Sequence, residues 1–255
     1  GDRHESSEKL MESDLGVLAA TSFNEVTAET FRHLLELSRG LRERLAGEGG
    51  STRYVAYGYH GTEVLVKGEY TWQTYTPYFQ GWAKMALEKI AIDAFQTGVS
   101  ATVYNCPEIL TNSSSVFSGV ELSLYPLVTA LNKEGAHSAH CQKILKECQA
   151  LLQEEVSYEK IQAYTDKYIT SDLVKSYSVF EKWPQHNGRE QMENMLNSSD
   201  YLISLHKDAK SLMTAVLSEE VFKATGRVMF NDSFKPTEPV WWLGHDVLAK
   251  QLALF

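Results

Sequence analysis

Apolar residues recur at helical spacing near the start of the chain. A polar stretch, residues 1–14, comes first and is expected to be frayed. Thr27 can cap a helix that the glycines at 47, 49 and 50 would end, and Arg39, Arg42 and Arg44 suit the negative end of its dipole. The apolar stripe of this predicted first helix consists of Phe31, Leu34, Leu35, Leu41 and Leu45.

The pattern then changes to short strands. Residues 53–60 and 62–72 are rich in Tyr, Val, Thr and Trp, which favour extended backbone. Residues 81–98 return to helical spacing, and Gly98 ends that helix. Residues 99–107 again favour a strand, and residues 118–128 offer one more possible strand, interrupted by Pro126.

After about residue 128 the spacing is helical. The predicted helices cover residues 136–154, 157–169, 171–183, 189–197, 199–224 and 245–255. We therefore expect an α+β protein, with a small antiparallel sheet region near 53–125 and a mainly helical C-terminal half. The natural division is 1–127 and 128–255, although no linker separates the two parts and they could form a single domain.

Composition and net charge argue against several classes of function. The net charge is −9, which argues against general binding of nucleic acid or anionic membranes. No apolar run approaches the roughly 20 residues of a membrane-spanning helix. Three cysteines (106, 141 and 148) are too few for a disulfide framework, which favours the cytoplasm or another reducing compartment.

The stretch YVAYGYHGT, within residues 53–62, carries the most specific chemical signal. It resembles the first catalytic motif of ADP-ribosyltransferases of the diphtheria-toxin and exotoxin-A type. The resemblance implies an NAD site in which His60 binds a ribose and the Gly61 backbone holds the nicotinamide amide. Glycine would let the main chain approach a flat ligand closely.

The same resemblance implies two further site components. An aromatic residue should stack on nicotinamide, and Tyr70, Trp72, Tyr75 and Tyr78 are the candidates. A catalytic glutamate on a later strand should stabilise the positive charge that develops as nicotinamide leaves. Glu121 is the best-placed candidate for that residue.

Two alternatives to this interpretation remain open. The Tyr-His-Gly-Thr corner can be an ordinary β-hairpin with its turn near His60 and Gly61. The protein would then be a non-enzymatic helical adaptor, regulator or assembly subunit. The apolar C-terminal arm containing Trp241 and Trp242 would suit packing on its own core, a protein partner or a homo-oligomer contact.

A metal site is not expected. His137 and Cys141 are four residues apart and could share one face of a helix. No further ligands at a recognised spacing accompany them. We interpret the pair as the start of a helix that contains core cysteines.

Overall fold

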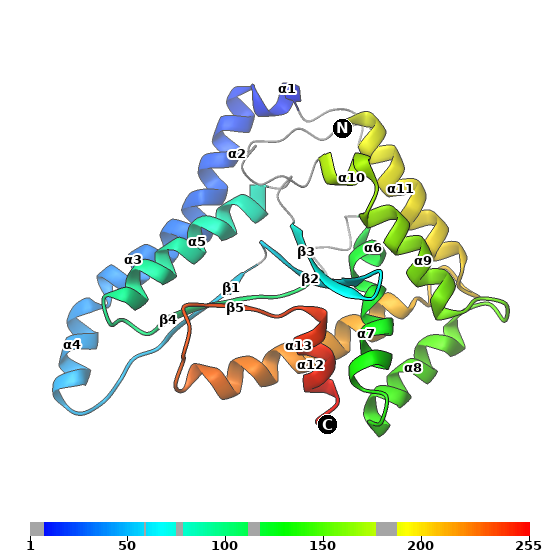
Figure 1. Cartoon of the computed structure of the whole chain (residues 1–255). Coiled ribbons are helices and arrows are strands. Elements are labelled where there is room, and N and C mark those ends of the chain that lie inside the picture. The colour runs from blue at the N-terminus through cyan, green and yellow to red at the C-terminus, as the bar shows by residue number, and fades with distance from the viewer. Residues whose placement is uncertain (1–7, 59, 75–78, 112–117, 177–187) are drawn as a thin grey trace.

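The computed structural model of the chain describes residues 8–58, 60–74, 79–111, 118–176 and 188–255 (Figure 1). Helices predominate, and two small sheets lie in the middle of the molecule. The predicted α+β class, with a mainly helical C-terminal half, is confirmed.

A long helical arm forms one edge of the molecule (Figure 1). It consists of α1 (Glu8–Met11), α2 (Asp14–Asn24), the π-helical turn η1 (Glu25–Glu29), α3 (Thr30–Leu37) and α4 (Arg39–Gly47). The arm starts earlier than the Thr27 cap predicted, because the Ser13 hydroxyl accepts a hydrogen bond from Gly16 N and caps α2. Its inner face buries Ala28, Phe31 and Leu35 against α5 (Phe79–Gln96).

The larger sheet is parallel and has three strands in the order β1 (Tyr54–Gly58), β4 (Ala101–Asn105) and β5 (Val240–Trp242). Helix α5 makes the crossover from β1 to β4. Every residue of β4 is buried, as expected for the central strand of a parallel sheet. On β1, the backbone N–H of Tyr54 and the backbone carbonyl of Gly58 form hydrogen bonds toward β4. The backbone N–H and C=O groups of Val55 and Tyr57 therefore face the outer edge of the sheet. Val55 and Tyr57 are 40% and 60% exposed.

The smaller sheet is the antiparallel hairpin of β2 (Gly61–Val66) and β3 (Glu69–Thr74). Its turn is formed by Lys67 and Gly68, which have φ values of 50° and 84°. The hairpin turn predicted near His60 and Gly61 was therefore wrong. His60 instead lies at the step from β1 of the parallel sheet to β2 of the hairpin.

The strand predicted over residues 118–128 was also wrong. This region forms α6 (Val120–Leu124) and α7 (Pro126–Glu134). Proline at the first position of α7 starts that helix, since the missing N–H needs no partner there. The buried side chains of Leu124, Leu127 and Leu131 recur at helical spacing, and this spacing outweighed the short alternation in the preceding residues.

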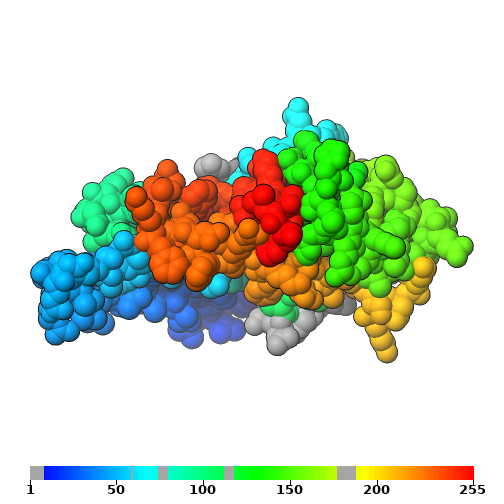
Figure 2. Space-filling view, turned by 90° about the horizontal axis from the view of Figure 1, so that it is seen from below, coloured from blue at the N-terminus to red at the C-terminus, as the bar shows by residue number. Residues whose placement is uncertain are grey.

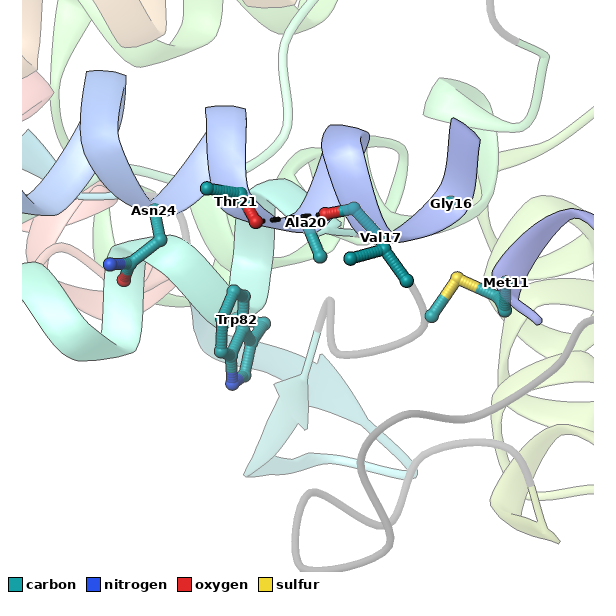
Figure 3. Close-up of a pocket in the computed structure, with 7 residues that line it drawn as sticks. All are labelled: Met11, Gly16, Val17, Ala20, Thr21, Asn24 and Trp82. Carbon is teal, nitrogen blue, oxygen red and sulfur yellow. Dashed lines mark hydrogen bonds between the residues drawn. The ribbon is translucent and has the colours of Figure 1, made fainter. Parts of the chain in front are cut away.

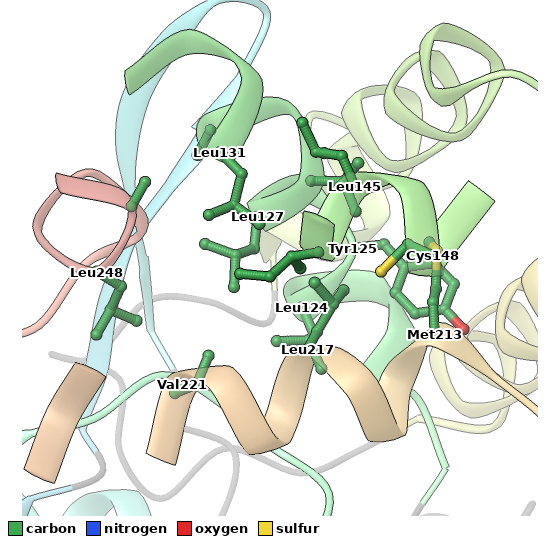
Figure 4. Packing of buried hydrophobic residues seen from close by; sticks show 14 of the residues in the cluster. Leu124, Tyr125, Leu127, Leu131, Leu145, Cys148, Met213, Leu217, Val221 and Leu248 are labelled. Atoms are coloured by element: carbon green, nitrogen blue, oxygen red, sulfur yellow. The ribbon is translucent and has the colours of Figure 1, made fainter. Parts of the chain in front are cut away.

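In the described residues further helices follow. They are α8 (Ala139–Leu151), α9 (Tyr158–Ile169), α10 (Asp172–Ser176), α11 (Arg189–Ser204), α12 (Met213–Ser233) and α13 (His245–Leu252). All of them except α10, which has no buried residue, contribute to the main core. Figure 4 shows the centre of this core, where side chains of α6, α7, α8, α12 and α13 interdigitate. Leu65 of β2 and Tyr104 of β4 belong to the same cluster, so the core crosses the proposed boundary at residue 127. Seen from below, the arm occupies one end and the helices α7 to α9 lie toward the other (Figure 2).

Candidate active site

The carboxyl ends of the three parallel strands bring polar groups together. Strand β1 ends at Gly58, β4 at Asn105 and β5 at Trp242, and all three point the same way. Open parallel sheets bind their ligands outside these strand ends. Side chains from α5 and from the start of the hairpin lie at this edge.

Glu88 of α5 is the centre of a buried hydrogen-bond network. Its carboxylate accepts a bond of 2.9 Å from Asn105 Nδ2, and both of its oxygens lie 3.1 Å from His60 Nδ1. The network closes because His60 N donates to Asn105 Oδ1 at 3.3 Å. Glu88 is only 6% exposed and Asn105 is fully buried. Such a network fixes the orientation of the imidazole ring.

Gly58 makes room for this network. A Cβ atom at residue 58 would lie 2.0 Å from Asn105 Oδ1 and 2.9 Å from Val103 Cγ1. Residue 58 is therefore a glycine because side chains of β4 occupy the space beside it. A left-handed backbone is not the reason.

Two indole rings and the imidazole ring form an aromatic wall beside the network. The ring centroids of Trp72 and Trp242 are 4.8 Å apart, and both rings lie within 5.7 Å of the His60 ring. All three contacts have the edge-to-face geometry that aromatic quadrupoles favour. Trp72 and Trp242 remain 40% and 37% exposed, so the wall has an accessible side.

Lys84 lies one helical turn before Glu88 on α5. Its Nζ donates a hydrogen bond of 2.6 Å to Tyr57 O on the outer edge of β1. Burial lowers the pKa of this ammonium group below its ordinary value, because the charged form loses water. Neighbouring Cys106 is not a nucleophile poised for reaction, since burial raises the pKa of its thiol to about 11.

The structure unites some of the sequence-predicted residues and separates others. His60 and Trp72 lie together at the site, and Gly61 begins β2 beside them. Tyr70 faces α7, where its hydroxyl donates to Glu134 at 2.8 Å. Tyr75 and Tyr78 lie outside the described residues.

Glu121 lies on helix α6, not on a strand. Its carboxylate accepts hydrogen bonds from Ser199 of α11 at 2.8 Å and from Thr214 of α12 at 3.5 Å. It is 7% exposed and is held within the helical core. Glu121 therefore links α6 to α11 and α12 within the core. Neither of these two partners belongs to the hydrogen-bond network of His60.

Sequence reasoning missed Glu88, Lys84, Asn105 and the role of Trp242 at the site. Two signals were present. Asn105 is a polar residue directly at the end of an apolar strand, and Lys84 and Glu88 are four apart on one helix face. The Trp241–Trp242 arm is strand β5. Trp241 is partly buried there and packs on the main core, and a partner contact through this arm stays a prediction.

Two hollows lie away from the network. One of about 420 Å³ lies between α2 and α5, and its lining includes Gly16, Ala20 and Thr21 of α2 and Trp82 of α5 (Figure 3). The other, of about 370 Å³, lies between the hairpin and the end of α9 and has Trp72 in its wall. Within the described part of the chain, no three potential metal ligands gather in one place. Among the same residues, every helix is too short or too polar to cross a bilayer.

The fold is that of an α+β protein, and its candidate ligand site is polar, lined by aromatic rings and placed at the ends of parallel strands. A family profile described as "Enoyl-acyl carrier protein reductase FabMG" matches residues 1–252. The chain therefore belongs to the FabMG family of enoyl-acyl carrier protein reductases. No curated protein matches it.

Two solved structures resemble the whole chain. The apo structure of FabMG, a novel type of enoyl-acyl carrier protein reductase, is 50% identical with a TM-score of 0.91. The NADH-bound structure of FabMG is 47% identical with a TM-score of 0.81. This chain spans 57% and 61% of the lengths of those two chains.

The family membership corrects the functional prediction. The resemblance of YVAYGYHGT to ADP-ribosyltransferases was wrong, because a match over nearly the whole chain outweighs nine residues. The alternative of a non-enzymatic adaptor is not supported either. The His60 corner does lie at a candidate ligand site, but with different neighbours from those that the resemblance implied.

Proposed function

We propose that this chain contributes to an NADH-dependent reductase acting on 2-enoyl thioesters carried by acyl carrier protein. The proposal rests on the FabMG family and on the NADH-bound relative. Because the chain spans less than two thirds of those relatives, their activity is carried over here as a proposal. The observation that carries it furthest is the Glu88 network beside the aromatic wall at the strand ends, with Lys84 one helical turn from Glu88 on α5.

The site residues fit a nicotinamide cofactor. The accessible indoles of Trp72 and Trp242 offer apolar ring surface to a flat ring, and His60 offers a ring nitrogen to a hydroxyl or amide. The position agrees with the strand ends at which dinucleotides bind in open α/β sheets. When bound, NADH would supply the hydride that reduces the carbon–carbon double bond.

Lys84 would handle the charge that this reduction creates. Hydride addition to the β-carbon of an enoyl thioester moves the electron pair toward the thioester oxygen, and a proton must then reach the α-carbon. An ammonium group with two donors left after bonding Tyr57 O can stabilise that oxygen. Its lowered pKa also makes it a better proton donor than an ordinary lysine.

The Glu88 network would act by positioning. Glu88 holds the His60 ring through Nδ1, and Asn105 holds both Glu88 and the His60 backbone. The ring is thereby fixed against the edges of the two indoles, so the aromatic wall keeps one shape. A fixed wall lowers the entropy lost when the cofactor binds.

Loss of NADH absorbance in the presence of crotonyl-acyl carrier protein tests the proposal. Lys84→Met should lower kcat by roughly 100-fold or more, since an oxyanion donor is lost. Lys89→Met is the matched control, because Lys89 is an exposed lysine of the same helix. Absence of NADH oxidation by the unaltered chain, or equal activity of both variants, would refute the proposal.

A further inference from the structure

The helical arm is apolar on two opposite faces. One face, with Ala28, Phe31 and Leu35, is buried against α5. The other face leaves six large aliphatic side chains open, and Leu37 is the most exposed of them at 87%. A helix that is apolar on both sides needs cover on both sides. The open residues are Leu15 (62%), Leu18 (64%), Val26 (70%), Leu34 (51%), Leu37 and Leu41 (47%).

These side chains form one continuous line, which we call the outer seam. Together with the exposed Ser22 and Thr30, its members follow one another at intervals of three or four residues. The π-helical turn η1 lies in the middle and takes up one extra residue. The seam therefore keeps the same side of the arm from α2 to α4, over a length of about 40 Å.

The outer seam is nearly symmetric about its own midpoint, Ala28. Reversing the direction of the arm places Leu15 over the position of Leu41, and it places Leu18 over Ser38, one residue from Leu37. In the same way Ser22 coincides with Leu34, and Val26 with Thr30. In a twofold interface each partner presents the same patch, so the seam has to be complementary to its own reverse, and here each aliphatic position meets an aliphatic or a small polar one.

We propose that the outer seam pairs with the outer seam of a second copy of this chain, antiparallel and about a twofold axis near Ala28. Each leucine then faces a leucine or a small polar side chain of the partner, as knobs face holes in a helical seam. The pairing covers the second apolar face of both arms at once.

The charge distribution along the arm supports the antiparallel direction. Acids outnumber bases from Glu8 to Glu29, whereas bases outnumber acids from Thr30 to Gly47. An antiparallel pair places the acidic half of one arm beside the basic half of the other, with Glu12 next to the partner's Arg44. A parallel pair would place like charges together.

Cysteine cross-linking tests the direction and the register. In a Cys106→Ser background, Leu18→Cys combined with Leu37→Cys should form a covalent dimer under mild oxidation. Leu18→Cys alone is the matched control, since two copies of residue 18 would lie roughly 28 Å apart, beyond the reach of a disulfide. Mixing the two single variants should give a covalent heterodimer. Cross-linking no greater in the double variant than in the controls would overturn the proposal.

Analytical ultracentrifugation tests the pairing without cross-links. The unaltered chain should be a dimer, and Leu18→Asp with Leu37→Asp should weaken it by about a thousandfold. Phe230→Asp with Phe234→Asp is the control, because both of these rings are 67% exposed but lie outside the arm. Unchanged circular dichroism would show that each variant folds. The proposal would be overturned if the unaltered chain were a monomer, or if its dimer were as stable with Leu18→Asp and Leu37→Asp as without them. The outer seam would then be covered by something other than a second copy.

Discussion

Asn105 Oδ1 occupies the space that a side chain at residue 58 would need. A Cβ atom at residue 58 would lie 2.0 Å from this oxygen, which is far too close for two atoms that are not bonded. Gly58→Ala should therefore displace the Asn105 side chain and break its bond to Glu88. We expect a loss of about 1–3 kcal/mol in the free energy of unfolding, because buried polar groups lose partners.

Urea denaturation measures the effect of Gly58→Ala. Gly40→Ala is the control, because a Cβ at residue 40 of α4 meets nothing within 4 Å. That substitution should stabilise the chain slightly, by up to about 1 kcal/mol. Equal stability of the two variants would contradict the close packing described for Gly58.

Replacing Glu88 by glutamine should loosen the His60 ring. Glu88 Oε1 accepts from Asn105 and lies 3.1 Å from His60 Nδ1, as does Oε2, whereas an amide would place an NH2 donor at one of these two positions against Nδ1 and so remove the two-oxygen grip on the ring. We expect Glu88→Gln to weaken NADH binding about tenfold and to leave the fold intact. Calorimetric titration with NADH measures this, and Glu155→Gln, at an exposed site, should bind as the unaltered chain does.

The lowered pKa of Lys84 predicts a limit on activity at high pH. The protonated form would stabilise the thioester oxygen, so kcat should be full at low pH and fall as pH rises through that pKa. The fall should come below pH 10.5, the ordinary value for lysine. Lys84→Arg should move it to higher pH, and an unchanged profile in that variant would assign the titration to another group.

Lys84 should also affect stability, with a defined sign. Because its pKa is lower in the folded chain, the unfolded chain holds more protons between that pKa and pH 10.5. Stability from this group therefore rises with pH across that window.

His245 should make the chain sensitive to acid. Its ring is fully buried, neither ring nitrogen has a hydrogen-bond partner in the described part of the chain, and burial lowers its pKa to about 3. The unfolded chain takes up a proton as pH falls below about 6.5, so stability is full above that value and is lost toward pH 3. The loss should approach roughly 5 kcal/mol.

His245→Leu should remove most of this acid sensitivity and cost little at neutral pH. Thermal unfolding between pH 7 and 4 measures it. His206, whose pKa burial also lowers, should supply part of the remaining slope. Substituting the exposed His137 by leucine should leave the pH dependence as it was, and an equal change in both variants would contradict the assignment to His245.

Long periodic segments made most of the fold predictable. Helices α5, α8 and α9 lie within a few residues of the predicted ranges, because their apolar stripes and end residues agree. The residues around Glu121 were harder. Their short alternation suits a strand, but the spacing of Leu124, Leu127 and Leu131 continues into a helix that Pro126 starts.

The site was only half predictable for a different reason. His60 and Trp72 are near each other in the sequence, so one unusual stretch pointed to both. Glu88 and Asn105 come to His60 only through the parallel pairing of β1 with β4, which the sequence pattern did not reveal. Nine residues suggested a transferase, and the actual partners of His60 come from elements outside that stretch.

The outer edge of β1 has a consequence for the behaviour of the chain in solution. Within the described residues this strand pairs on one side only, and an open strand edge is a template for adding strands from other molecules. Lysine is among the residues that proteins place on such edges to discourage aggregation. The Lys84 ammonium group already bonds Tyr57 O, so we expect the residue proposed for chemistry also to discourage strand addition at this edge. Lys84→Met would leave that carbonyl open and should aggregate more readily. Lys84→Arg keeps a donor there and should not.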